Sequence, residues 1–273
     1  MKKIKILDVV FDVVTLEEAA DRVFNFLQNP HGRQAQIVTP NPEIVLEAQH
    51  NKPFRNVLNK AYLSIPDGMG VVWASTCSAI FAKHKNPFVR AIKTFWSFAA
   101  LLVHRSFVHR IFPERVAGVD LMKKICDYSQ KYSYKLFLLG AKPGVAQKTK
   151  ENLEKLFSSI SIVGTFDGSP RDEDFSAIQK LIVETKPDIL FVAYGFPAQE
   201  LWIAHHLKEL PSVKIAMGVG GSFDFIAGVR KRAPEWLQNM GCEWMFRLAQ
   251  DPARWRRIYN ATIRFPLTVM RKK

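Results

Sequence analysis

The chain has 273 residues, of which 48% are hydrophobic and 23% are charged. This composition excludes a disordered chain, a collagen-like chain and a coiled coil, and the length suits one large domain or a domain with an appendage. The formal net charge is +14 at pH 7. It is concentrated in residues 83–112, with six Lys or Arg and no acid, and in residues 230–273, with eleven Lys or Arg and three acids. These two basic segments predict contact with an anionic surface or polyanion in two places.

The first residues, MKKIKILDVVFDVV, combine a basic tip with an apolar run that Asp8 and Asp12 interrupt. This pattern predicts a pair of strands and not a signal peptide. The three cysteines, Cys77, Cys126 and Cys242, lie far apart without CxxC or Cys/His spacing. They therefore indicate free thiols, and neither a disulfide framework nor a zinc site.

Strand-like and helix-like segments then alternate along the chain. The expected strands cover residues 9–14, 36–39, 61–65, 135–139, 160–165, 189–193 and 213–217. The expected helices begin after Thr15 and at Pro42, and cover residues 118–132, 145–157, 172–185 and 199–207. This alternation predicts βαβ units, and therefore an α/β fold with a Rossmann-like, largely parallel sheet flanked by helices. Ligands of such sheets bind beyond the carboxyl ends of the strands, where TPNPE, PDG, GAKPG, YGFPAQE and GVGGSFD fall.

Several of these turns carry polar side chains next to apolar strands. Thr39 and Asn41 in TPNPE are candidates for substrate binding, or for capping the helix that follows. Asp67 in PDG is placed where a carboxylate could take a proton from an attacking hydroxyl, although Asp before Gly is also a common turn former. Gln199 and Glu200 open a helix and could hydrogen-bond a uracil or a ribose, or Glu200 could satisfy the helix dipole.

The turn GVGGSFD, residues 218–224, follows the last expected strand. Gly220 and Gly221 would let backbone N–H groups approach a phosphate, and the alternative is a tight strand-to-helix turn. The turn lacks the GxGxxG spacing and the downstream acid of a dinucleotide-binding fold, which disfavours NAD.

The pattern of His and acidic residues indicates no metal site. His205 and His206 are adjacent, so on a helix they point about 100° apart and cannot easily share an ion. The acidic residues 172–174 are typical of a helix N-terminus. The sequence thus predicts neither a metal nor a cofactor.

The basic C-terminal segment contains three arginines at helical spacing. The pattern i, i+7 and i+10 puts Arg247, Arg254 and Arg257 on one face if the segment is a continuous helix. Pro252 argues for a break near Asp251, so this face depends on the helix continuing. Three guanidinium groups on one side suit a diphosphate, and the alternative is a solvated basic face.

Residues 86–112 begin with Asn86-Pro87, a cap followed by proline at the first helical position. One side of the expected helix is apolar and the other is basic: Phe88, Ile92, Phe95, Trp96, Ala99, Leu102 and Val103 against Arg90, Lys93, Ser97, His104 and Arg105. The uninterrupted apolar run is far shorter than the roughly 20 residues of a bilayer span. This pattern predicts an amphipathic helix at a membrane interface, and the alternative is a helix packed on the protein's own core.

Taken together, the motifs resemble those of the WecG/TagA/CpsF glycosyltransferases, glycosyltransferase family 26, from about Ile4 to Tyr259. The matching blocks are TPNPEIVLEAQ, IPDGMGVVWAS, PERVAGVDL, LFLLGAKPGVAQ, IVGTFDG, PDILFVAYGFPAQELWIA, VKIAMGVGGSFDFIAGVRKRAPEWLQ and GCEWMFRLAQDPARWRR. The resemblance implies transfer of N-acetylmannosamine or its uronic acid from a UDP donor. The acceptor would be an undecaprenyl-diphosphate-linked amino sugar at the cytoplasmic membrane face, and the transfer would invert the anomeric centre without a metal.

The resemblance also implies roles for the candidate residues. Asp67 would be the general base, and Arg115 of PERVAG would face the diphosphate or the acceptor. The substrate-binding residues would be Thr39 and Asn41 for the sugar, Gln199, Glu200, Gly220, Gly221 and Asp224 for the nucleotide, and Arg247, Arg254 and Arg257 for the diphosphate. The arginines would come from a C-terminal appendage that closes over the site.

The chain departs from the family pattern in one place. Family members usually pass from the PDG helix to PERVTG through a few residues, whereas this chain inserts residues of about 77–112 directly before Arg115, where they would flank the acceptor entrance. We therefore expect a catalytic core of residues 1–228 that carries this insertion. Residues 229–273 would form the helical basic appendage, which also contacts the membrane.

The expected partners are a UDP-sugar donor, a polyprenyl-diphosphate-linked glycan acceptor and an anionic membrane surface, with a homo-oligomer left open. The protein would then be cytoplasmic and peripheral on the inner face of the cell membrane. Nucleic acid is not an expected partner, because no helix-turn-helix, zinc-finger or ribonucleoprotein motif is present. A related donor, such as the uronic acid or glucose, with another lipid-linked acceptor is the alternative function.

Overall fold

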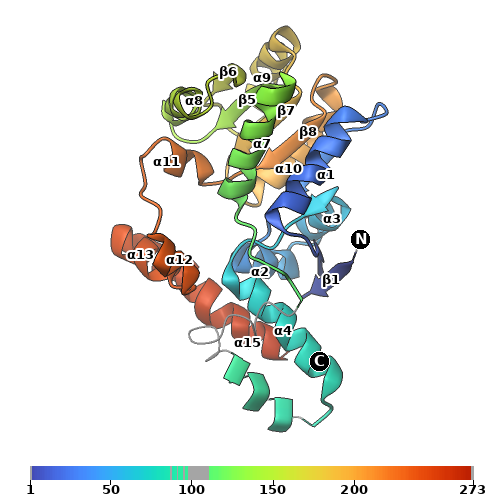
Figure 1. Cartoon of the computed structure of the whole chain (residues 1–273), viewed down its shortest axis with the longest axis vertical. Helices are drawn as coiled ribbons and strands as arrows, with labels where there is room; N and C mark the ends of the chain where they lie inside the picture. The colour runs from blue at the N-terminus through green and yellow to red at the C-terminus, as the bar shows by residue number, and fades with distance from the viewer. Residues whose placement is uncertain (1, 87, 91, 95, 98–110, 272–273) are drawn as a thin grey trace.

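The structure is a computed structural model that describes residues 2–86, 88–90, 92–94, 96–97 and 111–271 (Figure 1). Among these residues, a six-stranded sheet has the order β4-β3-β8-β7-β5-β6, and each neighbouring pair is parallel. Its strands are β3 (Ala35–Val38), β4 (Leu63–Ser64), β5 (Lys135–Gly140), β6 (Ser161–Phe166), β7 (Ile189–Ala193) and β8 (Ile215–Gly218). The expected α/β fold with a parallel sheet is confirmed.

The N-terminal residues form the predicted strand pair, β1 (Lys3–Ile6) and β2 (Val9–Asp12), as a separate antiparallel hairpin. Thr15 then caps α1 (Leu16–Gln28): its hydroxyl accepts from the Glu18 backbone N–H at 3.1 Å, and its own N–H donates to the Glu18 carboxylate at 2.8 Å. Buried Asp12 ties the hairpin to the main sheet, because its carboxylate accepts from the Ser64 N–H at 2.9 Å. The hairpin is therefore fixed to β4 beside the turn that carries PDG.

Alternate residues of the central strands face two different cores, as a side-chain period of two requires. In β5, Leu136 and Leu138 pack on one side, and Phe137 and Leu139 pack on the other. Helices α1, α7 (Gly118–Tyr132) and α8 (Val145–Leu156) cover the first side, and α9 (Asp172–Thr185) and α10 (Ala198–His206) cover the second. The sheet is thus the middle layer of three, and its carboxyl edge points toward the C-terminal helices (Figure 1).

A third core lies below that edge, between the hairpin and helices α2 (Pro42–His50), α3 (Lys52–Lys60) and α4 (Met69–Lys83). Helix α3 was not among the expected elements, although Asn51 before Lys52-Pro53 caps it in the usual way, accepting from the Phe54 N–H at 3.1 Å. Gly68 directly precedes α4 at its N-cap position, and its φ of 98° suits glycine. It then passes so close to α2 that a Cβ on Gly70 would lie 2.8 Å from Pro42.

The C-terminal segment is a chain of short helices that returns to this third core. After α11 (Ser222–Ile226) come α12 (Glu235–Asn239), α13 (Glu243–Gln250), the 3₁₀ turn η2 (Pro252–Arg254), α14 (Trp255–Tyr259), the π-helical turn η3 (Asn260–Arg264) and α15 (Phe265–Arg271). The predicted break near Asp251 is confirmed, because α13 ends at Gln250. Helix α15 packs on α2 and α4 and buries Phe265 and Val269 among them (Figure 1).

The insertion is described in part. Helix α4 continues to Lys83, and residues 88–90, 92–94 and 96–97 are helical. Asn86 caps this second segment, accepting from the Phe88 N–H at 2.9 Å. Residues Phe95, Ala99, Leu102, Val103, His104 and Arg105 of the expected amphipathic helix lie outside the described residues. Within the described ranges, none of the helices has both the length and the hydropathy needed to cross a membrane.

Candidate active site

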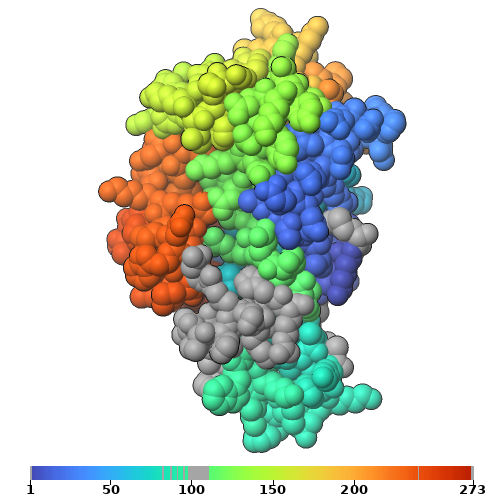
Figure 2. Space-filling view, in the orientation of Figure 1, coloured from blue at the N-terminus to red at the C-terminus, as the bar shows by residue number. Residues whose placement is uncertain are grey.

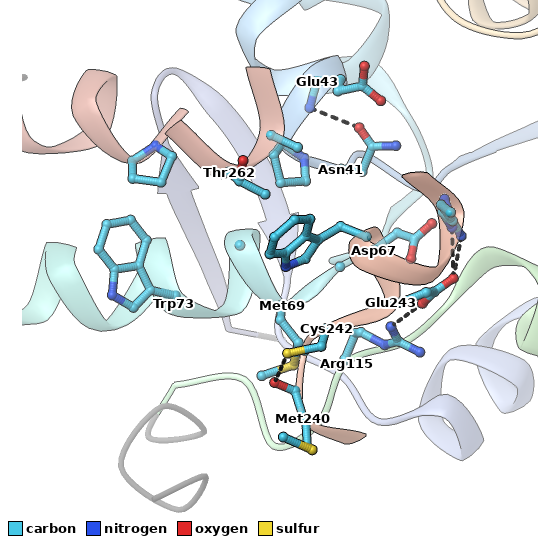
Figure 3. A pocket seen from close by; sticks show the side chains of 18 residues that line it. Asn41, Glu43, Asp67, Met69, Trp73, Arg115, Met240, Cys242, Glu243 and Thr262 are labelled. Carbon is cyan, nitrogen blue, oxygen red and sulfur yellow. Dashed lines mark hydrogen bonds and ion pairs between the residues drawn. The ribbon is translucent and has the colours of Figure 1, made fainter. Parts of the chain in front are cut away.

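Two adjoining cavities lie at the carboxyl edge of the sheet. The first, here the polar cavity, has a volume of about 460 Å³ and is lined by the turns that follow β3, β4, β7 and β8 and by C-terminal arginines. The second, here the apolar cavity, has a volume of about 340 Å³. It lies between the start of α4, with Met69 and Trp73, and the C-terminal helices, with Met240, Trp244 and Pro266 (Figure 3).

Asp67 lines both cavities. The turn between β4 and α4 carries it, and its backbone N–H donates to the Pro40 carbonyl at 3.2 Å. Burial raises the pKa of its carboxyl above the ordinary value of 3.8, and the Arg115 and Arg247 charges oppose that rise. Within the described part of the chain, the carboxylate makes no hydrogen bond or ion pair. An unpaired carboxyl with a raised pKa, placed at the junction of two cavities, is suited to accepting a proton.

Thr39 and Asn41 follow β3 and reach the same region. Thr39 lines the polar cavity and packs against the start of α7, where a Cβ on Gly118 would lie 3.2 Å from its hydroxyl oxygen. Asn41 lines both cavities, but its amide oxygen also caps α2, accepting from the backbone N–H groups of Glu43 and Ile44 at 3.0 and 3.1 Å. The capping alternative therefore holds for Asn41 without removing it from the cavity wall.

Gln199 and Glu200 have different positions. Gln199 lines the polar cavity, and its amide oxygen accepts from the N–H groups of Gly195 at 3.1 Å and Gly220 at 3.0 Å. Its amide nitrogen donates to the Glu200 carboxylate at 2.8 Å. Glu200 lies behind this wall, 1% exposed, and burial raises its pKa to about 7. Gln199 thus joins the turns after β7 and β8 at the cavity, and Glu200 holds the Gln199 amide from behind.

The predicted glycine turn after β8 lies in the polar cavity. Gly220, Gly221 and Asp224 all line it. Gly220 has a φ of 49°, in the left-handed region that glycine adopts most readily. Its backbone N–H donates to the Gln199 amide oxygen, as described above. The Asp224 carboxylate lies 3.5 Å from the Arg230 guanidinium. The turn is therefore positioned by side chains on both sides.

Arginines from five positions line the polar cavity: Arg230, Arg232, Arg247, Arg254 and Arg257. The helix is broken at Asp251, so the condition for one continuous face is not met, yet Arg247, Arg254 and Arg257 all line the same cavity. Sequence reasoning missed Arg230 and Arg232, which follow the glycine turn in the run RKR and were counted only as charge. Glu43, Asp67, Asp224 and Glu243 line the same cavity. Guanidinium groups gathered in this way suit a diphosphate.

Carboxylates hold these arginines in place. Arg254 pairs with Asp251 at 3.1 Å, and Arg257 reaches back to Glu43 at 3.0 Å, which links α14 to the start of α2. Arg232 makes two hydrogen bonds to Asp120, at 2.5 and 2.7 Å. Glu43 belongs to α2 and Asp120 to α7, so the pairs of Arg257 and Arg232 also position the C-terminal segment on the core, whereas the pair of Arg254 with Asp251 is local.

Glu243 stands between the two arginines that act on Asp67. Its carboxylate accepts from Arg115 at 3.0 Å and from Arg247 at 3.0 Å (Figure 3). Burial by itself would raise the pKa of the Glu243 carboxyl. The charges and hydrogen bonds of Arg247 and Arg115 together lower it by more, so the net shift of this pKa is downward. Arg115 itself lines the apolar cavity and donates to Gln238 of α12 at 3.3 Å. The loop before α7 and the C-terminal helices therefore meet at Arg115.

No group of three or more His, Cys, Asp or Glu that could hold a metal ion is found among the described residues. His206 stacks on Phe175 with ring centroids 3.8 Å apart and lies between Asp172 and Glu209, away from both cavities. Cys77, Cys126 and Cys242 are free and buried. Among the described residues, the basic side chains that line the polar cavity are arginines.

The chain matches the glycosyl transferase WecG/TagA/CpsF family over two overlapping segments, residues 4–105 and 97–273. Three similar proteins are each named N-acetylglucosaminyldiphosphoundecaprenol N-acetyl-beta-D-mannosaminyltransferase. The one from Bacillus spizizenii is 34% identical over 83% of this chain and 75% of its own length. The one from Bacillus subtilis is 30% identical over 88% and 80%, and the one from Staphylococcus aureus is 32% identical over 94% and 87%.

Proposed function

The chain belongs to the glycosyl transferase WecG/TagA/CpsF family, and we propose that it transfers N-acetylmannosamine from a UDP donor to a polyprenyl-diphosphate-linked N-acetylglucosamine. The names of its relatives support this sugar and this acceptor. The observation that carries the proposal is the position of Asp67, the unpaired carboxylate that lines both the polar and the apolar cavity. One cavity would hold the donor and the other the acceptor, so that they meet at this group.

The polar cavity suits the UDP-sugar. Five arginines line it, and guanidinium groups bind diphosphates well; Gly220 and Gly221 of the glycine turn line the same cavity. Negative charge develops on the departing UDP, and fixed cations stabilise that charge. We propose that arginines do this without a divalent ion.

The apolar cavity suits the acceptor. Trp73, Met240 and Trp244 give it an apolar wall for the part of the acceptor next to the lipid, and Arg115 lies at its edge for the acceptor diphosphate. The C-terminal residues 229–273 close over both cavities in this proposal. The enzyme then works peripherally at an anionic membrane surface, on the inner face of the cell membrane where the lipid-linked acceptor lies.

The reaction follows from this arrangement. The acceptor hydroxyl oxygen attacks the anomeric carbon of the donor, and the bond from that carbon to the β-phosphate oxygen breaks. The hydroxyl proton passes to Asp67, and the electron pair of the broken bond leaves with UDP. Attack from the face opposite to UDP inverts the anomeric centre and gives a β-linked disaccharide on the lipid diphosphate.

A UDP-release assay with a panel of donors tests the proposal. UDP-linked N-acetylmannosamine, its uronic acid, N-acetylglucosamine and glucose are each supplied with a short-chain polyprenyl-diphosphate N-acetylglucosamine acceptor. We expect acceptor-dependent release with UDP-N-acetylmannosamine, unchanged by EDTA. If UDP is released with only one of the other donors, N-acetylmannosamine is not the transferred sugar. Loss of release in EDTA, restored by a divalent ion, would overturn its metal-independent part.

A further inference from the structure

The insertion after α4 has an unusual distribution of side chains. Phe88, Ile92 and Trp96 are spaced four residues apart, which places them on one face of the helical segment. They are 72%, 43% and 66% exposed. On the opposite face, Thr94 and Ser97 are buried at 1% and 0% exposure. The large apolar side chains therefore point away from the protein, and the small polar ones point into it.

This orientation is held by contacts to α4. The Ser97 hydroxyl accepts from the Trp73 indole N–H at 3.1 Å, and Trp73 also lines the apolar cavity. The Arg90 guanidinium donates to the Phe81 carbonyl at 3.0 Å. The alternative of a helix that buries its apolar face on the core is therefore wrong for the three described apolar positions. The helical segment instead has a defined position beside Trp73 of the apolar cavity, with these three apolar side chains turned outward.

Charge indicates what this face contacts. Lys93 in this segment and Lys83 and Lys85 directly before it are exposed, and residues 83–112 contain no acid. Aromatic side chains bordered by lysines are typical of helices that lie in the interface of an anionic bilayer. The helical residues 88–90, 92–94 and 96–97 lie beside α4, at the end of the molecule opposite α8 and α9 (Figures 1 and 2).

We infer that Phe88, Ile92 and Trp96, bordered by these lysines, form a membrane anchor that inserts into the headgroup region of an anionic bilayer. The anchor holds the apolar cavity close to the lipid surface, from which the lipid-linked acceptor would enter. The inference rests on the proposed function for this role, but binding to the bilayer can be measured independently.

The test measures co-sedimentation of the full chain with vesicles of phosphatidylglycerol and phosphatidylcholine. The triple substitution F88S/I92S/W96S, here the stripe variant, replaces the three apolar residues of the anchor. It should lower the partition coefficient between vesicles and water at least about tenfold. The matched control L156S/V183S replaces exposed apolar residues at the far end of the molecule and should leave partition unchanged. Equal thermal unfolding temperatures would show that the stripe variant is folded.

A charge variant, K83E/K85E/K93E, should weaken binding to the mixed vesicles and leave any binding to pure phosphatidylcholine unchanged. Undiminished partition of the folded stripe variant would overturn the inference. So would a stripe variant that turns a dimer into a monomer in sedimentation equilibrium without changing partition, because the face would then contact a second copy of the chain.

The same variants separate the anchor from the chemistry. With a short-chain acceptor in solution, the stripe variant should retain the transfer rate, whereas with a long-chain acceptor in vesicles it should be slower than the control variant. If no donor in the panel is used, the proposed function fails while vesicle partition still decides the anchor. If transfer proceeds and partition is unaffected, the anchor fails alone.

Discussion

The carboxyl of Asp67 has an environment in which burial favours the protonated form and two arginines favour the ionised form. Burial has the larger effect, so the pKa is raised and ionisation of Asp67 destabilises the folded protein. The side chain is kept without a hydrogen-bond partner in the described structure although it lies near Arg115 and Arg247. Such a group is poorly suited to a structural role and well suited to exchanging a proton with a bound hydroxyl.

Replacing Asp67 by Asn removes the proton acceptor and keeps the shape. We expect turnover to fall at least about 100-fold, because base catalysis is lost. UDP affinity, measured by calorimetry, should change little, and the unfolding temperature should not fall, because the removed charge was unfavourable. Asp127→Asn, at a half-buried position of α7 that lines neither cavity, is the control. Near-wild-type turnover of Asp67→Asn would exclude Asp67 as the base.

Glu200 makes stability depend on pH. Its pKa is about 7 in the folded protein against an ordinary 4.5. Below pH 4.5 Glu200 is protonated in both the folded and the unfolded protein, and its contribution to the free energy of unfolding is fully present. Between pH 4.5 and about 7 the unfolded protein loses this proton first, so the free energy of unfolding falls as pH rises. Above about pH 7 the fall levels off. The total loss is on the order of 3 kcal/mol.

Glu200→Gln abolishes this loss while keeping an amide oxygen for Gln199. We expect its advantage in unfolding free energy over the wild type to grow between about pH 5 and about pH 8, as measured by urea unfolding. Glu184→Gln, an exposed substitution on α9, should show no such trend. A constant difference between Glu200→Gln and wild type across this range would contradict a raised pKa.

Among the elements, α15 has the most consequence for the site. It lies at the end of the chain, yet Phe265 is fully buried and packs in one core with Trp73 of α4. Trp73 in turn lines the apolar cavity and holds Ser97 of the insertion. The last helix therefore supports α4, and through α4 both the cavity and the insertion.

Phe265→Ala should lower the free energy of unfolding by about 3–5 kcal/mol, because it removes a fully buried aromatic ring and leaves a cavity. Leu267→Ala, on the same helix but 40% exposed, is the matched control and should cost less than about 1 kcal/mol. Chemical unfolding of both variants measures the difference. Equal losses would mean that α15 is not packed on the core as described.

Across the whole molecule, the two basic segments have different surroundings. The C-terminal arginines Arg247, Arg254 and Arg257 line the polar cavity and pair with acids, whereas Lys83, Lys85 and Lys93 of the insertion are exposed. Segments that look alike in charge thus serve two purposes in the proposal, one facing a diphosphate and the other facing lipid headgroups.

Salt should therefore act mainly on membrane binding. Raising NaCl from about 0.1 M to about 1 M shortens the screening length from about 10 Å to about 3 Å, which weakens attraction between exposed lysines and anionic lipid. We expect partition onto phosphatidylglycerol vesicles to fall steeply, with the remaining binding abolished by F88S/I92S/W96S. Partition that does not respond to salt would show that the lysines contribute nothing.

The sequence by itself determined the alternating strands and helices, the capped starts at Thr15 and Asn41, the family, and the turns that build the site. These features depend on periodicity and turn chemistry within a few neighbouring residues, so they can be read locally. Helix α3 was missed although its signal, Asn51 before Lys-Pro, is of the same local kind.

Only the tertiary structure decided whether each candidate side chain lines the polar cavity or lies behind its lining. Glu200 lies behind Gln199, and Arg254 and Arg257 converge with Arg247 in spite of the broken helix. Phe88, Ile92 and Trp96 of the insertion likewise point outward instead of onto the core. Each outcome depends on contacts between residues far apart in the chain, such as Arg257 with Glu43 and Trp73 with Ser97, and local periodicity carries no information about such contacts.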